Sequence, residues 1–328
     1  MAAKTPQLLW TEPAGHESLA TCLRAVLAHL DMERPLAELT ATLGLGAAVV
    51  AAPNDELAFW DTYARDARLV ETAGLYGLRL RPLHPRDAAV GLDSSEEYAQ
   101  HFLDSYVPLV AAALEHGQLV FAWQGWPAPG ERLWGVITHR QASQLCGHAP
   151  GHGGQLISLI GPALQVYVAE EQRRTDEVLA AARLFAHVAR QACEMWAGAW
   201  AADAALYTGA TAYEAWKDAL RSRRKSRTGA LPVHQQHCLA ARGVATARSH
   251  LAHWLRDVAE SLTGNQQALA ERWAATCDRV AGQLRLFDSA RSVRTLFDEP
   301  DGVERICNVM DDVSRTEAET ISALEDVS

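Results

Sequence analysis

Apolar residues near the start of the chain repeat with the period of an α-helix. Four of them fall at positions i, i+3, i+4 and i+7, which places them on one helical face: Leu23, Val26, Leu27 and Leu30. Thr21 precedes this run, and its hydroxyl can accept a hydrogen bond from a backbone N–H of the first turn. The pattern therefore predicts a helix with Thr21 as its N-cap and Cys22 as its first residue.

The rest of the first half shows further helical patterns and then short β-type runs. Helices are expected over 36–43, 57–73 and 94–116, with Pro108 near a break, and a short edge strand over 78–83. After Gly117 we expect strands at 119–123 and 134–138, a loop at 147–154, and a hairpin formed by 156–160 and 164–168. Helices followed by a small antiparallel sheet are typical of an α+β domain, which we place at residues 1–170.

The second half is helical in pattern and rich in alanine, the strongest helix former. Helices are expected over 175–201, 211–221, 235–262 and 265–286, and the acidic tail after Asp298 is expected to form a short helix with a frayed end. The sequence thus predicts an α+β protein, in which an α-helical bundle over residues 171–328 follows the mixed domain.

Composition and charge exclude several classes of protein. The chain has 328 residues, 48% of them hydrophobic, and a formal net charge of −10, which argues against a general nucleic-acid or membrane-surface binder. No apolar stretch is long enough to span a bilayer. The six cysteines are dispersed and form no CxxC pair, as expected of thiols in a reducing compartment. These features predict a soluble cytoplasmic protein.

Cys22 is the first candidate for chemistry. A thiol at a helix start is stabilised as a thiolate by the exposed N–H groups and the helix dipole, and a thiolate is the form that acts as a nucleophile. The alternative is a buried cysteine that fills space on an amphipathic helix.

The order of these features resembles a known family. After the cysteine helix come a Leu-Gly-Leu-Gly segment at 43–46, a helix-glycine-strand segment at 115–123 and a second strand at 134–138. This order is similar to that of the N-terminal papain-like domain of the butirosin biosynthesis protein H family and, more distantly, of bacteriocin-processing cysteine peptidases. The segments 206–220 and 238–255 look like the helical region that follows this domain in bacterial relatives.

The resemblance implies a papain-like fold and a cysteine-dependent acyltransferase or amide hydrolase of a bacterial biosynthetic or peptide-processing pathway. Its substrate would be a peptide or an acyl group on a carrier protein, with Cys22 as nucleophile. The positions where the family has its histidine hold Leu133 and Gln155, so His139, or otherwise His152, is the expected base. Glu17 stands near the place of the oxyanion-binding glutamine, where a carboxylate would repel a developing negative charge.

These departures leave a second function open, a catalytically inactive papain-like protein that binds a peptide or partner protein in a cleft between its domains, or that dimerises through its helices. A third is a helical metal-binding protein, because histidines and cysteines gather at two places, Cys146, His148 and His152, and His234, His237 and Cys238. We expect no cofactor. The first-domain tryptophans are candidates to line a pocket: Trp10, Trp60, Trp123, Trp126 and Trp134.

Overall fold

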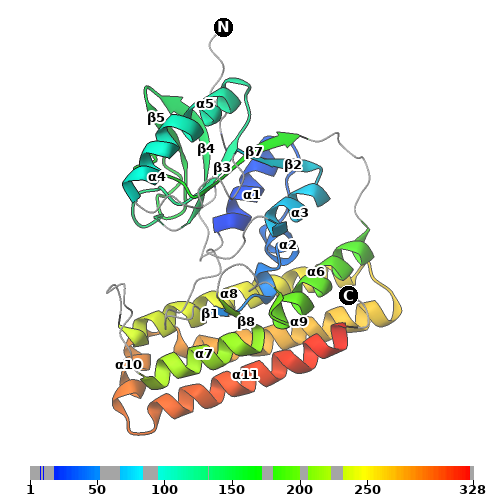
Figure 1. Cartoon of the computed structure of the whole chain (residues 1–328). Helices are drawn as coiled ribbons and strands as arrows, with labels where there is room; N and C mark the ends of the chain where they lie inside the picture. Colours follow the sequence, from blue (N-terminus) through cyan, green and yellow to red (C-terminus); the bar gives the residue numbers. More distant parts are fainter. Residues whose placement is uncertain are drawn as a thin grey trace. The chain divides into compact units, whose positions relative to one another are not determined.

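The computed structural model describes residues 8, 10, 18–51, 67–83, 95–131, 133–171, 180–199, 206–222 and 232–325. The chain divides into two compact units, the first of residues 1–39 and 64–178 and the second of residues 40–63 and 179–328. The first unit contains a small antiparallel sheet and the second is mainly helical (Figure 1). The predicted α+β class with a helical second half is confirmed. The segment 40–63, which the sequence analysis grouped with the mixed domain, belongs to the helical unit.

The sheet of the first unit has six strands in the order β2-β7-β3-β4-β5-β6, and every neighbouring pair is antiparallel. The strands are β2 (Leu78–Pro82), β3 (Val120–Trp123), β4 (Trp134–Gln141), β5 (Gln144–His148), β6 (Ile157–Ser158) and β7 (Gln165–Glu171). β2 lies at an edge, as Pro82 predicts.

Two predictions about this sheet are wrong. The segments 156–160 and 164–168 do not form a hairpin, because β6 pairs with β5 whereas β7 pairs with β2 and β3. β5 lies where part of a loop was expected. Gly147 is required within this strand, since a Cβ there would lie 2.0 Å from the carbonyl oxygen of Val136 on the neighbouring strand.

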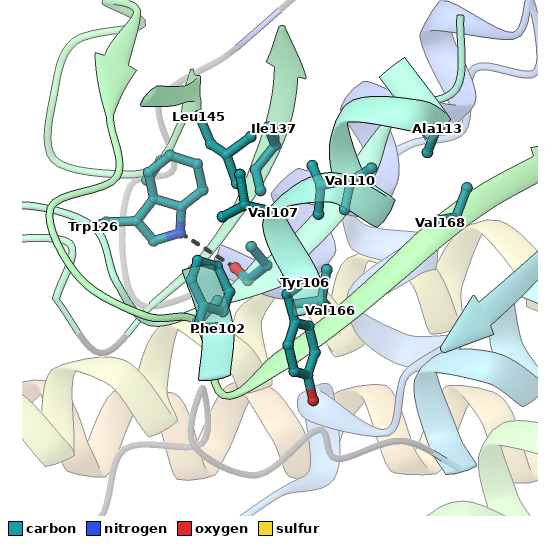
Figure 2. Close-up of a cluster of buried hydrophobic side chains, with 14 residues drawn as sticks. Phe102, Tyr106, Val107, Val110, Ala113, Trp126, Ile137, Leu145, Val166 and Val168 are labelled. Carbon is teal, nitrogen blue, oxygen red and sulfur yellow. Dashed lines mark hydrogen bonds between the residues drawn. The ribbon is translucent and has the colours of Figure 1, made fainter. Parts of the chain in front are cut away.

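Helices cover both faces of the sheet. The helices of this part are α1 (Ser18–His29), α2 (Leu36–Thr42), α3 (Ala67–Leu75), α4 (Ser95–His101), a π-helical turn η4 (Phe102–Tyr106) and α5 (Val107–Glu115). Residues of η4 and α5 pack with Ile137, Val166 and Val168 of the strands in one hydrophobic cluster (Figure 2). α1 contacts β4 from the opposite side (Figure 1).

Side chains that alternate along the strands define the second face of the sheet, which we call the α1 face. Its members are Phe121, Trp123, Trp134, Val136, Gln165 and Tyr167, which are paired across β3, β4 and β7. Paired residues in an antiparallel sheet share a face. Phe121 and Val136 are fully buried, so both faces of the sheet take part in the core.

Gly135→Ala should destabilise the first unit by about 1–3 kcal/mol, the usual cost of overpacking a core. A Cβ at Gly135 would lie 2.3–2.6 Å from three ring atoms of Trp126, and Trp126 is held by a hydrogen bond from Nε1 to the Ala122 oxygen (Figure 2). Gly74→Ala in α3 is the control, because a Cβ there meets nothing within 4 Å; it should be neutral or stabilising. Equal midpoints for the two variants in urea denaturation would refute this packing argument.

The second unit begins with the end of α2, the 3₁₀ turn η1 (Leu45–Ala47) and β1 (Val50–Ala51), which pairs with β8 (Tyr207–Thr208). Its helices are α6 (Ala181–Trp196), α7 (Gly209–Ser222), α8 (Val233–Ala259), α9 (Gly264–Leu284), the short turn η6 (Arg285–Phe287), α10 (Ala290–Asp298) and α11 (Gly302–Leu324). The long helices α7, α8, α9 and α11 run side by side (Figure 1).

The end of the chain departs from the prediction of a short frayed helix. α11 has 23 residues, and its apolar side chains repeat at helical spacing and are buried in the bundle, namely Val303, Ile306, Cys307, Met310 and Val313. α10 was not predicted. The segment was predicted from its acidic composition, because many charged residues lie between these apolar positions. The helical repeat of the apolar residues was nevertheless present in the sequence.

A buried charged residue ties three parts of the helical unit together. Arg248 in α8 donates from Nη1 to the carbonyl oxygens of Gly46, at 2.6 Å, and Ala48, at 3.1 Å. Its other guanidinium nitrogens bind the carboxylate of Glu317 in α11, which also accepts from the Tyr213 hydroxyl at 2.8 Å. The η1 turn is thereby attached to the helices through backbone carbonyls that would otherwise be buried without a donor.

Candidate functional site

Cys22 does not begin a helix. The described part of α1 begins at Ser18, so Cys22 stands at least four residues inside the helix, and the prediction of Thr21 as N-cap is wrong. The side chain of Cys22 is 0% exposed, and the helix is buried on several sides. The effect of the helix dipole is confined to the first turn, so the thiol lies beyond the place where the helix start stabilises a thiolate.

Ser18 is the first described residue of α1. Its hydroxyl oxygen accepts a hydrogen bond of 3.1 Å from the backbone N–H of Trp134, the first residue of β4. Ser18 is fully buried. The first described turn of α1 is therefore attached to the start of the central strand β4 through the Ser18 hydroxyl.

His139 lies toward the far end of β4. Ile137 pairs with Gly147 and His139 with Cys146, so Thr138 is an extra residue in a β-bulge. The bulge restores His139 to the same face as Val136, which is the α1 face. His139 is five residues away from Trp134 along the strand, about 16 Å at the usual rise, and is thus distant from the start of α1.

His148 lies closer to the start of α1 than His139 does. It pairs with Val136, which is two residues from Trp134, and therefore also faces α1. Its ring stacks on Trp10 at 5.9 Å and donates from Nδ1 to the Gly154 oxygen at 3.1 Å. Burial lowers the pKa of His148 below its usual value, and the neighbouring His139 lowers it further. His148 is therefore a neutral imidazole at neutral pH.

His152, the other candidate base, stabilises a loop. Its Nε2 lies 3.2 Å from the carbonyl oxygen of Pro127, to which it donates. This bond joins the loop after β5 to the turn between β3 and β4. Glu17, the candidate near the oxyanion position, lies outside the described residues. The structure thus does not bring Cys22, His139 and His152 together by any contact among the described residues.

The α1 face carries a row of polar side chains that residue type and spacing in the sequence do not group together. Trp123 on β3 pairs directly with Trp134 on β4 and with Gln165 on β7. The indole nitrogens of both tryptophans and the amide oxygen of Gln165 are buried and have no hydrogen-bond partner among the described residues. The hydroxyl of Thr21 in α1 is also buried and has no hydrogen-bond partner among the described residues.

Such atoms are costly to a folded protein, about 1–3 kcal/mol for each buried polar group without a partner. Most buried polar groups in native proteins are paired, and a group that is not paired calls for an explanation. Trp126, on the opposite face of the same sheet, shows the usual behaviour, because its Nε1 donates to the Ala122 oxygen. The sequence analysis had named Trp123 and Trp134 as pocket candidates, but only the strand register adds Gln165 to them.

The candidate metal ligands have other partners. Sγ of Cys146 lies 3.4 Å from the Ser158 hydroxyl, and Nδ1 of His237 accepts from the Trp216 indole at 3.1 Å. In the described part of the chain, no three His, Cys, Asp or Glu side chains lie together as a metal site requires. The described helices also include none with the length and apolar character that crossing a membrane demands.

Neither the models of known protein families nor the curated protein sequences give a match to this chain.

Proposed function

We propose that the first unit is a papain-like domain that binds an extended peptide or acyl-amide segment without forming a covalent intermediate. The supporting observation is the position of Cys22, which is 0% exposed and stands one turn inside α1. A nucleophilic cysteine has to reach its substrate, and reactive thiols are at least partly exposed. The six dispersed cysteines fit binding in a reducing compartment, the cytoplasm.

Ser18 supports the same proposal. In the first described turn of α1, its hydroxyl accepts a hydrogen bond from the Trp134 N–H. This contact gives Ser18 a positioning role, since it attaches α1 to the strand that carries Trp134.

Acyl transfer or amide hydrolysis through Cys22 is the second candidate. Its support is the neutral imidazole of His148, which shares the α1 face with His139 and could serve as a base. It requires α1 or its surroundings to move so that the Cys22 thiol becomes accessible.

Labelling of the full chain with an acyl or vinyl thiol probe separates the two candidates. At pH 6.5, where an ordinary thiol is protonated, we expect Cys22 to react no faster than Cys277. The latter is the matched control because it is also buried, and burial raises its pKa to about 12. Labelled residues are identified by mass spectrometry of proteolytic fragments.

Selective labelling of Cys22 in the folded protein would contradict the proposal and favour the enzyme. A Cys22→Ala variant supplies the complementary readout, because it should retain peptide binding if no covalent bond is formed. Loss of binding in a variant that keeps its circular dichroism spectrum and melting temperature would count against the non-covalent proposal.

A further inference from the structure

One aromatic side chain from the N-terminal end of the chain packs on a histidine of the sheet. The indole of Trp10 stacks on the imidazole of His148 in β5, with the ring centroids 5.9 Å apart and the ring planes inclined by 21°. Both residues belong to the first unit. The sequence separation of the two residues is large, so the contact shows that the imidazole face accepts an indole from a distant segment.

The imidazole of His148 is held in a fixed orientation. Its Nδ1 donates to the carbonyl oxygen of Gly154 at 3.1 Å, and such a bond sets both the ring orientation and the tautomer of a histidine. Burial lowers the pKa of His148, so the ring is uncharged at neutral pH. It therefore presents a flat, neutral face, which favours an uncharged aromatic partner.

The loop over residues 149–154 borders the same indole and is attached elsewhere. His152 donates from Nε2 to the Pro127 oxygen at 3.2 Å, which joins this loop to the turn between β3 and β4. Gly154 has a φ of 74°, and a Cβ there would lie 3.6 Å from Cδ1 of Trp10, at ordinary contact distance. The imidazole and the loop are thus held by contacts that do not involve Trp10, and a site formed in advance costs little to bind.

The stack lies at the surface of the unit. Trp10 and His148 are both half-buried, whereas Trp126 and Trp134 are each 1% exposed and belong to the core. A stack between partly exposed rings is modest in strength. An aromatic ring from another chain can therefore replace Trp10 on His148 without any opening of the sheet core.

We propose that His148 and Gly154 form a site for an uncharged aromatic side chain of a bound peptide, and that Trp10 occupies this site as an intramolecular competitor when no peptide is bound. This inference rests on the proposed function. It gives that function a ligand class, a peptide with a tryptophan-like side chain, and a form of regulation by the N-terminal segment of the same chain.

The peptide N-acetyl-Leu-Leu-Trp-Thr-amide, which copies residues 8–11, tests the competition on the full-length protein. Trp10→Ala should bind it about two- to ten-fold more tightly than the wild type in calorimetric titrations, as the strength of an aromatic stack implies. Trp10→Phe keeps an aromatic ring and is the matched control, with an affinity close to that of the wild type. The same peptide with alanine in place of tryptophan should bind Trp10→Ala more weakly.

Nuclear magnetic resonance shows where the peptide binds. The Cε1–H resonance of His148, assigned with His148→Ala, should move in Trp10→Ala because the ring current of the indole is lost, and should return toward its wild-type position when the peptide is added. The resonance of His116, an exposed histidine whose Nδ1 lies 2.7 Å from the Ala112 oxygen, should stay in place. In the wild type, the peptide should move the Trp10 indole N–H resonance in a saturable manner, which requires no variant.

The outcomes that would overturn the inference are distinct from those that concern the proposed function. Equal affinity of the peptide for the wild type and Trp10→Ala would overturn the competition, and an unchanged His148 resonance at saturating peptide would overturn the site. Selective labelling of Cys22 together with a shifted His148 resonance would leave the aromatic site in place and overturn non-covalent binding. An unshifted His148 resonance together with an inert Cys22 would overturn the aromatic site alone.

Discussion

Glu317→Leu should lower the free energy of unfolding of the helical unit by about 3–5 kcal/mol, because removing one partner of a buried ion pair leaves the other charge uncompensated. Arg248 is 2% exposed, and Glu317 binds both its Nε and its Nη2. The substitution also removes the acceptor of the Tyr213 hydroxyl, and burial already holds the pKa of that phenol well above its usual value. Urea denaturation followed by circular dichroism measures the loss.

A double-mutant cycle shows how much of this loss belongs to the pair. Arg248→Met alone leaves the Gly46 and Ala48 oxygens without their donor, so it should also be strongly destabilising. The double variant should lose less than the sum of the two single variants, because neither charge is then left alone. Glu304→Leu is the control: it lies in the same helix α11 as Glu317 and removes the exposed ion pair with Arg221 of α7, so it should have little effect. Additive losses in the cycle would contradict a coupled pair.

Local patterns predicted most of the elements because hydrophobic period and turn residues are properties of neighbouring residues. The second helix was expected at 36–43 and is found at Leu36–Thr42, with Gly44 in the left-handed conformation that ends it. The long helix at 94–116 was expected to break near Pro108, and α5 begins at Val107 after a π-helical turn. Strands were expected at 119–123 and 134–138 and are found at Val120–Trp123 and Trp134–Gln141.

Pairing between distant segments was less predictable. β7 does not pair with β6 but lies between β2 and β3 in the sheet. No local feature of the sequence indicates which strands pair. The strand β5 contains Gly147, which was predicted to begin a loop because glycine is common in turns. In the structure, a glycine is required there because β4 approaches closely. A short connection between two strands favours a hairpin. β6 and β7 are joined by a short connection but pair with other strands of the sheet.

In the candidate site, too, local features were predictable from the sequence and the pairing of distant residues was not. The sequence identified Cys22 as notable and two of the tryptophans as pocket candidates, since residue type alone suggests both. It placed the helix start at Cys22, whereas Ser18 and the residues up to Thr21 are already helical, so the thiol lies in the interior of α1 and not at its tip. The grouping of Gln165 with Trp123 depends on a register between strands separated by more than 40 residues, and residue spacing carries no information about it.

Acidification should weaken the helical unit through His237. This side chain in α8 is fully buried between the Trp216 and Phe287 rings, its Nδ1 accepts from the Trp216 indole, and burial lowers its pKa to about 3. Since an unfolded histidine titrates near 6.5, the unfolded chain binds more protons than the folded one between about pH 6.5 and 3. The free energy of unfolding therefore falls as the pH falls, by about 1.4 kcal/mol per pH unit.

Between pH 6 and pH 4 this one group should remove about 2.5 kcal/mol of stability. His237→Asn offers the Trp216 indole an acceptor without a proton-binding ring, so it should flatten the pH dependence by that amount even if it lowers stability at pH 7. His253→Asn makes the same change at an exposed position of the same helix and should keep the wild-type slope. If denaturation midpoints of His237→Asn and wild type fall in parallel with pH, then His237 accepts its proton in the folded state and the burial argument is wrong.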